Sequence, residues 1–240
     1  MCRSTRIITP EFDHQKNLKD DEYTMQVLYE DNHVLAVVKP AGLPTMGVAE
    51  GEKSLLSEAK KYVAQKYAKP GNVYLGIVSR LDTPTTGVVV IARTSKAASR
   101  LSEQFKNRTV QKTYFALVEG RVPHEEGTLR DRLAEEKRHR KMFVTRSAEG
   151  VEAILHYRVA KRYSTYTLLE IHLETGRKHQ IRLQISHAGF PILGDRKYGA
   201  KTSFPVGIAL HAGSLVFRHP TLGEEIKIEA DFPATWKKFL

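Results

Sequence analysis

The sequence predicts an α+β fold with a mixed, mainly antiparallel central sheet and flanking helices and loops. Three observations support this. Strand-like apolar runs outnumber helical patterns, most neighbouring strands can pair antiparallel, and strands and helices do not alternate regularly. The 240 residues are enough for one sizeable core or for two small lobes that share a sheet.

The first elements are expected from residue 26 onward. Two β-rich runs, 26–30 and 33–38, are separated by the turn pair Asp31-Asn32. Residues 54–68 have helical spacing of apolar side chains, and Ser54 is a suitable N-cap. This part of the chain therefore predicts a hairpin followed by a helix.

The remaining elements follow from the same periodicities. A helix is expected after Thr94, which is its expected N-cap, with Ala97, Leu101 and Phe105 on its inward face, and a short helix is expected over 179–187. Strands are expected at 87–92, 112–118, 153–160, 165–174, 208–217 and 225–229. Residues 1–22 are polar and mixed in charge, which predicts a flexible tail before one domain over 23–240.

The chain is strongly basic, with 38 Lys and Arg against 27 Asp and Glu and a net charge of +11. This balance favours a polyanionic partner, most commonly nucleic acid. The single cysteine, Cys2, excludes a disulfide framework and a Cys-rich zinc site. No apolar stretch is long enough to span a bilayer and no signal peptide is visible, so we expect a cytoplasmic protein.

Three polar clusters adjoin apolar elements. Residues 79–87 place Asp82 in a loop before a buried strand, where it is either a reactive carboxylate or the cap of a turn. Residues 175–182 bring basic groups to a helix start, which suits either an anion clamp or a solvated face. Tyr114 opens a strand as either a working phenol or a packing residue. The basic run 137–141 is an exposed loop or hairpin tip, with or without a role in binding.

Other chemistries have little support in the sequence. The histidines lack the spacing of a helical metal site, and no Gly-x-Ser-x-Gly turn marks a hydrolase. The segment 194–199 has the wrong pattern for a dinucleotide or phosphate loop.

Taken together, the clusters resemble the RluA family of RNA pseudouridine synthases. The similarity runs from about Gln26 to Pro220 and includes its motifs in order. These are Val27-Leu28-Tyr29-Glu30-Asp31 with Lys39-Pro40-Ala41-Gly42, Arg80-Leu81-Asp82, Lys112-Thr113-Tyr114, Thr175-Gly176-Arg177-Lys178-His179-Gln180-Ile181-Arg182, Gly194-Asp195 with Tyr198-Gly199, and Leu210-His211-Ala212 with His219-Pro220. One departure is Ser79, where the family usually has histidine before the arginine.

The resemblance implies the pseudouridine synthase fold, conversion of uridine in ribosomal or transfer RNA to pseudouridine, and a role for each motif residue. Asp82 would be the essential carboxylate, Arg182 its partner, and Tyr114 the group against the uracil ring. Arg80 would fill the gap left by a flipped nucleotide, and Ile181 would line the base pocket. Phosphate contacts are expected from Lys39, Arg177, Lys178, Arg138 and Arg140.

The resemblance implies a reaction that needs no cofactor and no metal. RNA is the expected partner, and we expect a monomer that does not associate with membranes. The 22 residues before the first strand are too few for a separate N-terminal RNA-binding module. Two alternatives stay open from the sequence. One is a catalytically inactive RNA-binding protein of the same fold, which Ser79 invites; the other is a metal-dependent nuclease or phosphotransferase built on Asp82.

Overall fold

The computed structural model describes residues 6–8, 25–68, 70–136, 138 and 141–240. The chain forms two compact units, each built from two stretches of sequence. The first unit comprises Met1–Val110 and Ser214–Asp231, and the second comprises Gln111–Gly213 and Phe232–Leu240. The domain expected over 23–240 therefore contains two units.

The first unit is built around a sheet of short, apolar strands. Its centre is antiparallel, because β3 pairs with β2 on one side and with β5 on the other. The unit also contains β1, which pairs in parallel with β12, and β4, which pairs with β5. Strand β12 pairs with residues 214–218 of β11, Leu210–Arg218. The other bounds are β1 Arg6–Ile8, β2 Gln26–Glu30, β3 Val34–Lys39, β4 Gly76–Ile77, β5 Thr86–Ala92 and β12 Glu225–Glu229.

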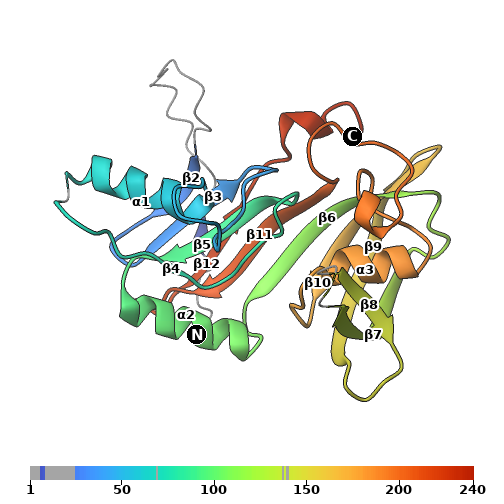
Figure 1. The fold of residues 1–240 in the computed structure, drawn as a ribbon, viewed down its shortest axis with the longest axis horizontal. Helices are drawn as coiled ribbons and strands as arrows, with labels where there is room; N and C mark the ends of the chain where they lie inside the picture. The colour runs from blue at the N-terminus through green and yellow to red at the C-terminus, as the bar shows by residue number, and fades with distance from the viewer. Residues whose placement is uncertain (1–5, 9–24, 69, 137, 139–140) are drawn as a thin grey trace. The chain divides into compact units, whose positions relative to one another are not determined.

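Two helices cover opposite faces of these strands (Figure 1). Helix α1, Leu55–Lys66, packs on the face that carries Leu35 and Val89, and helix α2, Ser95–Lys106, packs on the face that carries Ala36 and Val90. Because side chains alternate along a strand, the apolar runs 34–38 of β3 and 88–92 of β5 supply both layers of core.

The helix starts follow the sequence closely. The Ser54 hydroxyl accepts the Ser57 amide N–H, and the Ser57 hydroxyl accepts the Ser54 amide N–H, which together make a reciprocal cap for α1. The Thr94 hydroxyl accepts the amide N–H of Ala97 at the start of α2. Both predicted caps are confirmed.

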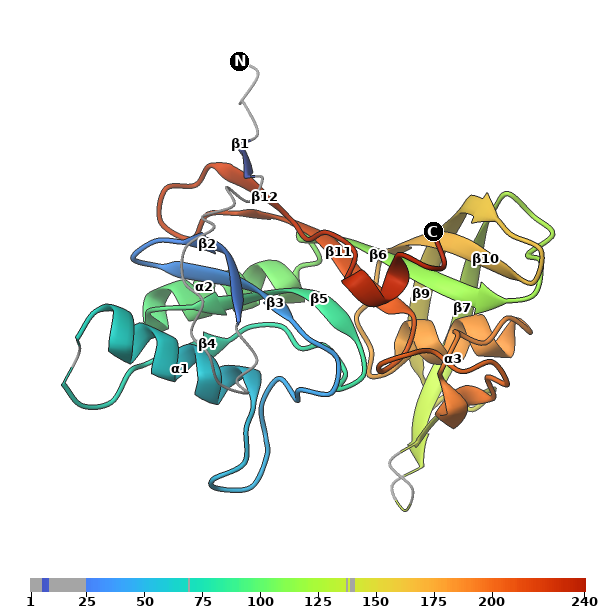
Figure 2. The ribbon, with the colours of Figure 1, turned by 90° about the horizontal axis from the view of Figure 1, so that it is seen from above.

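The second unit contains a longer antiparallel sheet with the strand order β11-β6-β10-β9-β7-β8. Figure 2 shows β6, β7, β9 and β10 of this sheet. Helix α3 packs against β7 and β8, and the fully buried Trp236 stacks on Phe232 at 5.0 Å between ring centroids. The bounds are β6 Gln111–Glu119, β7 Glu126–Glu136, β8 Lys141–Thr145, β9 Val151–Arg162, β10 Tyr166–Leu173, α3 Gln180–His187, η1 Arg196–Tyr198 and η2 Ala234–Trp236.

The predicted α+β class is confirmed, with four corrections to the elements. The segment Arg6–Ile8 was expected in a flexible tail but forms β1 on the edge of β12. The short β4, the 11-residue β7 and the strand β8 were not predicted. The basic run adjoins the β7–β8 hairpin, and its described residue Arg138 lies in the turn between the two strands. No described helix is long and apolar enough to cross a membrane.

Candidate active site

Asp82 lies in the loop that leads into β5, and that loop is held at several points within the first unit. The Thr45 hydroxyl donates to the Leu81 carbonyl at 2.9 Å and accepts the Leu81 amide N–H at 3.2 Å. The Thr85 amide N–H donates to the Asp82 carbonyl at 3.0 Å, which closes the turn around the aspartate. The half-buried Asp82 carboxyl therefore sits on a backbone that has little freedom to move.

Lys39 is a second anchor of the same loop. Its side chain is fully buried, and its Nζ donates to the carbonyls of Pro40 and Leu43 at 2.8 Å and of Thr83 at 3.0 Å. The Gly42 amide N–H also donates to the Thr83 carbonyl, at 2.9 Å. The end of β3 and the Asp82 loop are thus tied together through one ammonium group and one backbone bond.

This position corrects the expected role of Lys39. A buried ammonium that donates all three of its protons to carbonyls has none left for an RNA phosphate. Burial lowers the pKa of Lys39 to about 7, and the Asp82 carboxylate opposes that shift by favouring the charged form. Lys39 is therefore an internal support of the Asp82 loop, and its charge beside the Asp82 carboxylate is lost as the pH rises through neutrality.

Arg80 is exposed and comes two residues before Asp82 in the same loop. Its guanidinium is thus presented at the surface by a segment whose next residue, Leu81, is fixed by Thr45. Such an arrangement is compatible with a cation that enters a vacated base stack, as the sequence predicted for Arg80, and its role stays a prediction.

Arg182 lies in the first turn of α3 and is held by a buried carboxylate in the second unit. Its Nε donates to one oxygen of Asp195 at 2.7 Å, and its NH2 group donates to the other at 2.9 Å. The two side chains are 6% and 1% exposed, so this is a two-pronged ion pair removed from water. The guanidinium plane is consequently fixed before any substrate arrives.

Asp195 owes its position to the glycine before it. Gly194 has φ +82°, and a Cβ there would lie 2.7 Å from the Phe204 Cβ and 2.8 Å from the Gly207 carbonyl oxygen. Only glycine fits this turn without displacing backbone. Gly194 thus permits the turn that directs the Asp195 carboxylate toward Arg182, which gives the Gly194-Asp195 motif a structural reason.

The segment before α3 is organised by Gln180. The Gln180 Oε1 accepts from the Thr175 hydroxyl at 2.8 Å and from the Arg177 amide N–H at 3.0 Å, while its Nε2 donates to the Ile154 carbonyl at 3.0 Å. His179, directly before the helix, adopts the left-handed conformation with φ +53°. One buried amide therefore shapes the turn that presents Arg177 and Lys178 to solvent.

Tyr114 and Ile181 belong to the core side of the second unit. Tyr114 lies on β6 opposite Ile171 of β10 and is partly buried against the main core, whereas Ile181 is buried within that core. Their expected contacts with the uracil base stay predictions.

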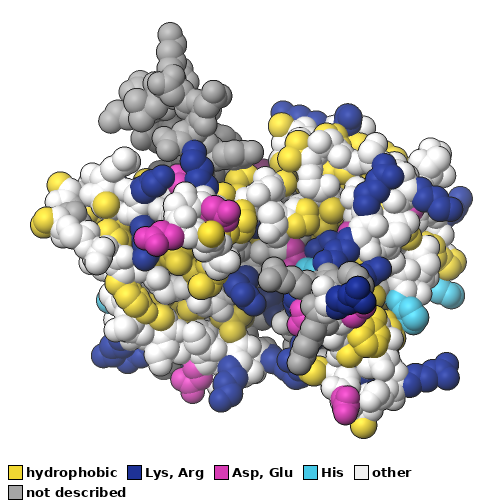
Figure 3. All heavy atoms as spheres, viewed as in Figure 1, with side chains coloured by type: hydrophobic (Ala, Val, Ile, Leu, Met, Phe, Trp, Pro, Cys, Tyr) yellow, Lys and Arg dark blue, Asp and Glu magenta, His cyan; other side chains and the backbone are white. Residues whose placement is uncertain are grey.

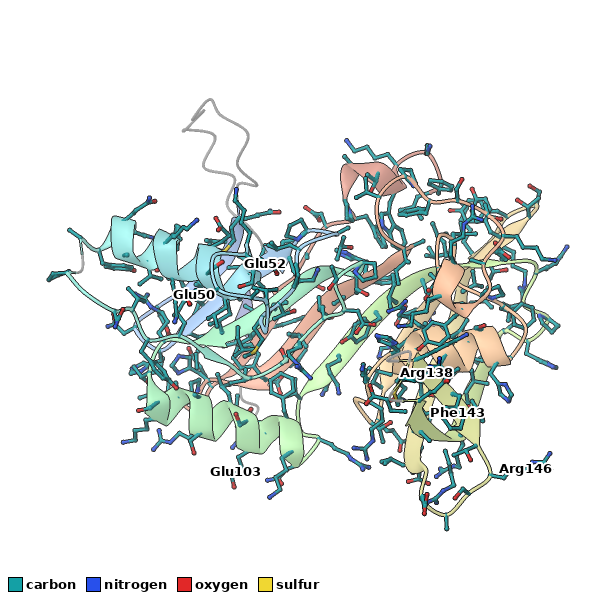
Figure 4. All side chains as sticks on the ribbon, viewed as in Figure 1. Glu50, Glu52, Glu103, Arg138, Phe143 and Arg146 are labelled. Carbon is teal, nitrogen blue, oxygen red and sulfur yellow. The ribbon has the colours of Figure 1, made fainter. Side chains whose placement is uncertain are left out.

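The predicted phosphate-binding residues of the second unit differ in their surroundings. Arg177 is exposed and its Nε donates to the Glu152 carbonyl at 3.1 Å, while Lys178 is exposed and paired with Glu135. Arg138 is exposed at the hairpin turn (Figure 4), and Arg140 lies outside the described residues. Lys and Arg side chains are spread over the visible surface (Figure 3), as the net charge requires.

The structure thus places the Asp82 loop, with Arg80 and Lys39, in the first unit, and Tyr114, Ile181 and Arg182 in the second. The pairing of Arg182 with Asp82 stays a prediction. Asp195, Tyr198 and Gln180 were not predicted as site residues, although all three lie in motifs that the sequence contains. Among the described residues, no group of three or more His, Cys, Asp and Glu could hold a metal ion.

Solved structures share this fold. The human RNA pseudouridylate synthase domain containing 4 matches with a TM-score of 0.75, over 89% of this chain and 92% of its own, at 24% identity. The human RNA pseudouridylate synthase domain containing 1 matches with a TM-score of 0.70, over 90% and 87%, at 22% identity. At these identities the match establishes the architecture alone, that of pseudouridine synthases.

Sequence comparisons identify the family. The family model of RNA pseudouridylate synthase matches residues 33–187, a span that includes Asp82, Tyr114 and Arg182. An uncharacterized RNA pseudouridine synthase of Bacillus subtilis is 38% identical, over 87% of this chain and 69% of its own. The ribosomal large subunit pseudouridine synthase D of Xanthomonas campestris is 35% identical, over 94% and 71%. The chain belongs to the RNA pseudouridylate synthase family, and it is an enzyme that isomerises uridine in RNA.

Proposed function

We propose that this enzyme modifies specific uridines of structured ribosomal RNA, with Asp82 as the essential carboxylate. The observation that carries the catalytic assignment is the anchoring of the Asp82 loop by Thr45, Lys39 and the turn at Thr85. A reactive carboxylate on a fixed backbone is preorganised for reaction at one sugar carbon. Two relatives named ribosomal large subunit pseudouridine synthase D, at 35% identity, support ribosomal RNA as the substrate, with transfer RNA as the alternative. A ribosomal substrate would place the enzyme in the cytoplasm.

The proposed reaction is an isomerisation in which atoms balance within the nucleotide. The bond from ribose C1′ to uracil N1 breaks, the base turns, and a bond from C1′ to uracil C5 forms. The proton leaves C5, and N1 gains a proton. Asp82 either attacks C1′ or removes a proton from the sugar to give a glycal; both routes need its ionised form.

The other site residues have supporting roles in this proposal. Asp195 fixes the plane of the Arg182 guanidinium, which would pair with the Asp82 carboxylate and favour its charged form. Tyr114 would lie against the uracil ring, assisting removal of the C5 proton, and Ile181 would line the base pocket. Arg80 would occupy the space left by the flipped nucleotide, which offsets part of the cost of unstacking.

Phosphate binding would come from exposed cations of the second unit. Arg177, Lys178 and Arg138 are exposed, and each lies in a turn, where an RNA backbone can approach. Lys178 would have to exchange its Glu135 partner for a phosphate oxygen, which costs little because both side chains are solvent-exposed.

The experiment is a comparison of Asp82→Asn with the wild-type enzyme. Tritium release from RNA labelled at uracil C5 should be abolished by the substitution, while the circular dichroism spectrum and the RNA dissociation constant stay unchanged. Asp231→Asn, at an exposed position of the same unit, is the matched control and should keep full activity. Retained turnover by Asp82→Asn would refute the assignment of the carboxylate.

The substrate is tested separately from the carboxylate. Pseudouridines are mapped in ribosomal and transfer RNA from a strain that lacks the gene and from its parent. Loss of one or more positions in ribosomal RNA is the expected result, and loss confined to transfer RNA would overturn the proposed substrate.

A further inference from the structure

Tyr198 connects three parts of the second unit through one side chain. It closes η1 and is 5% exposed. Its hydroxyl oxygen lies 2.7 Å from His179 Nδ1 and accepts the Met142 amide N–H at 3.2 Å. The Arg182 guanidinium carbon lies 5.1 Å from the centre of its ring. The residue therefore contacts β8, the turn before α3, and the arginine that Asp195 holds.

The bond to Met142 has a particular cause. β8 is the last strand in the sheet order, so one row of its amide groups has no partner strand. The Met142 N–H belongs to that free edge, and the Tyr198 hydroxyl satisfies it in a buried setting. The same hydroxyl is hydrogen-bonded to His179 Nδ1, and that contact fixes how the imidazole is turned.

The ring of Tyr198 makes a second kind of contact. A guanidinium about 5 Å from a tyrosine ring centre is attracted by the negative charge of the ring face. Asp195 binds the edge of the Arg182 guanidinium, and the Tyr198 ring lies against it from another side. Lys141, the first residue of β8 after the basic turn, has its Nζ 5.7 Å from the centre of the same ring.

We propose that Tyr198 is a positioning residue that couples the RNA-contacting β7–β8 hairpin to Arg182. Its hydroxyl holds the edge of the hairpin against α3, and its ring holds the guanidinium in the orientation set by Asp195. The inference rests on the proposed function, in which the hairpin turn binds RNA and Arg182 supports the reacting carboxylate. A side chain that only filled the core would not need its hydroxyl.

Two substitutions separate the two contacts. Tyr198→Phe removes the hydroxyl and keeps the ring; we expect KM for RNA to rise about tenfold with kcat changed less than threefold, as for one lost hydrogen bond. Tyr198→Leu removes the ring as well, and kcat should then fall about tenfold or more. Tyr166→Phe, which removes a half-buried hydroxyl that bonds the Phe239 carbonyl, is the matched control and should leave both constants unchanged.

The coupling is tested with Arg138→Ala. If the Tyr198 hydroxyl acts through the hairpin, Tyr198→Phe should raise KM much less in the Arg138→Ala background than in the wild type. A KM effect of the same size in both backgrounds would overturn the coupling. The positioning role would be overturned if kcat and KM changed by the same factor within each variant, Tyr198→Phe and Tyr198→Leu, and if that factor followed the loss of thermal stability.

These outcomes are distinct from failure of the proposed function. An enzyme that releases no tritium in its wild-type form, or that keeps turnover as Asp82→Asn, refutes the proposed function itself. A wild-type enzyme that is active and loses activity as Asp82→Asn leaves that function in place, and the Tyr198 variants then decide the coupling alone.

Discussion

The buried ammonium of Lys39 makes a specific prediction about stability and pH. Burial lowers its pKa to about 7 in the folded chain, against 10.5 for an exposed lysine. Between these two values the unfolded chain holds a proton that the folded chain has released. Raising the pH makes it less favourable for the unfolded state to hold that proton, so the free energy of unfolding should rise with pH in this window.

The magnitude follows from the difference between the two pKa values. One proton bound only in the unfolded state changes the free energy of unfolding by about 1.4 kcal/mol per pH unit. Summed from pH 7, where about half of the folded chains carry the charge, to pH 9, the gain is about 2 kcal/mol. Lys66 and Tyr62, whose pKa values are both raised, affect stability only near pH 10 and above, outside this interval.

The assay is urea unfolding followed by circular dichroism at pH 7, 8 and 9 and constant ionic strength. Lys39→Met removes the titrating group while keeping an unbranched side chain, so the difference in stability between the two proteins cancels the other groups. That difference should shift in favour of the wild type by about 2 kcal/mol from pH 7 to pH 9. Parallel pH profiles would refute the reasoning, because they would mean that Lys39 keeps its charge throughout.

Two further predictions concern the second unit. Asp195→Asn removes the charge of the carboxylate that binds the buried Arg182 guanidinium through both of its oxygens, so unfolding in urea should become easier by about 3–5 kcal/mol; Glu152→Gln, which breaks the exposed pair with Arg130, should cost less than about 1 kcal/mol, and equal costs would contradict the argument. Arg138→Ala should weaken RNA binding and reduce the slope of log Kd against log salt by about 1, measured by fluorescence anisotropy. Arg146→Ala, which changes an arginine at the other end of β8 (Figure 4), is the comparison variant. An unchanged slope for Arg138→Ala would show that the turn does not bind phosphate.

Local patterns in the sequence were sufficient for most of the fold. Ser54 and Thr94 were predicted as caps from residue type and spacing alone, because a cap is a contact within three residues. The apolar β5 was equally plain, since a strand buried on both faces has a continuous apolar run. By contrast, β7 contains many charged residues and few apolar ones. The apolar alternation that indicates a strand is therefore weak, and no strand was predicted there.

The candidate site was predictable in its motifs but not in its contacts. Asp195 and Arg182 are thirteen residues apart, and nothing in their spacing shows that one carboxylate faces the other's guanidinium. Lys39 follows an apolar strand, where a lysine usually reaches solvent; only the folded chain shows three carbonyls gathered around it. Such contacts depend on which loops meet in the folded chain, and no periodic pattern of the sequence records those meetings.

The interleaving of the two units has a consequence for how the chain is made. The second unit takes in residues 232–240 after the chain has returned to the first unit over 214–231. Trp236 fills the interior of the second unit, so that interior is incomplete until the ribosome has synthesised the chain past residue 236. Each unit is then completed only after residues of the other unit have been synthesised, and neither can be produced by cutting the gene at a single point.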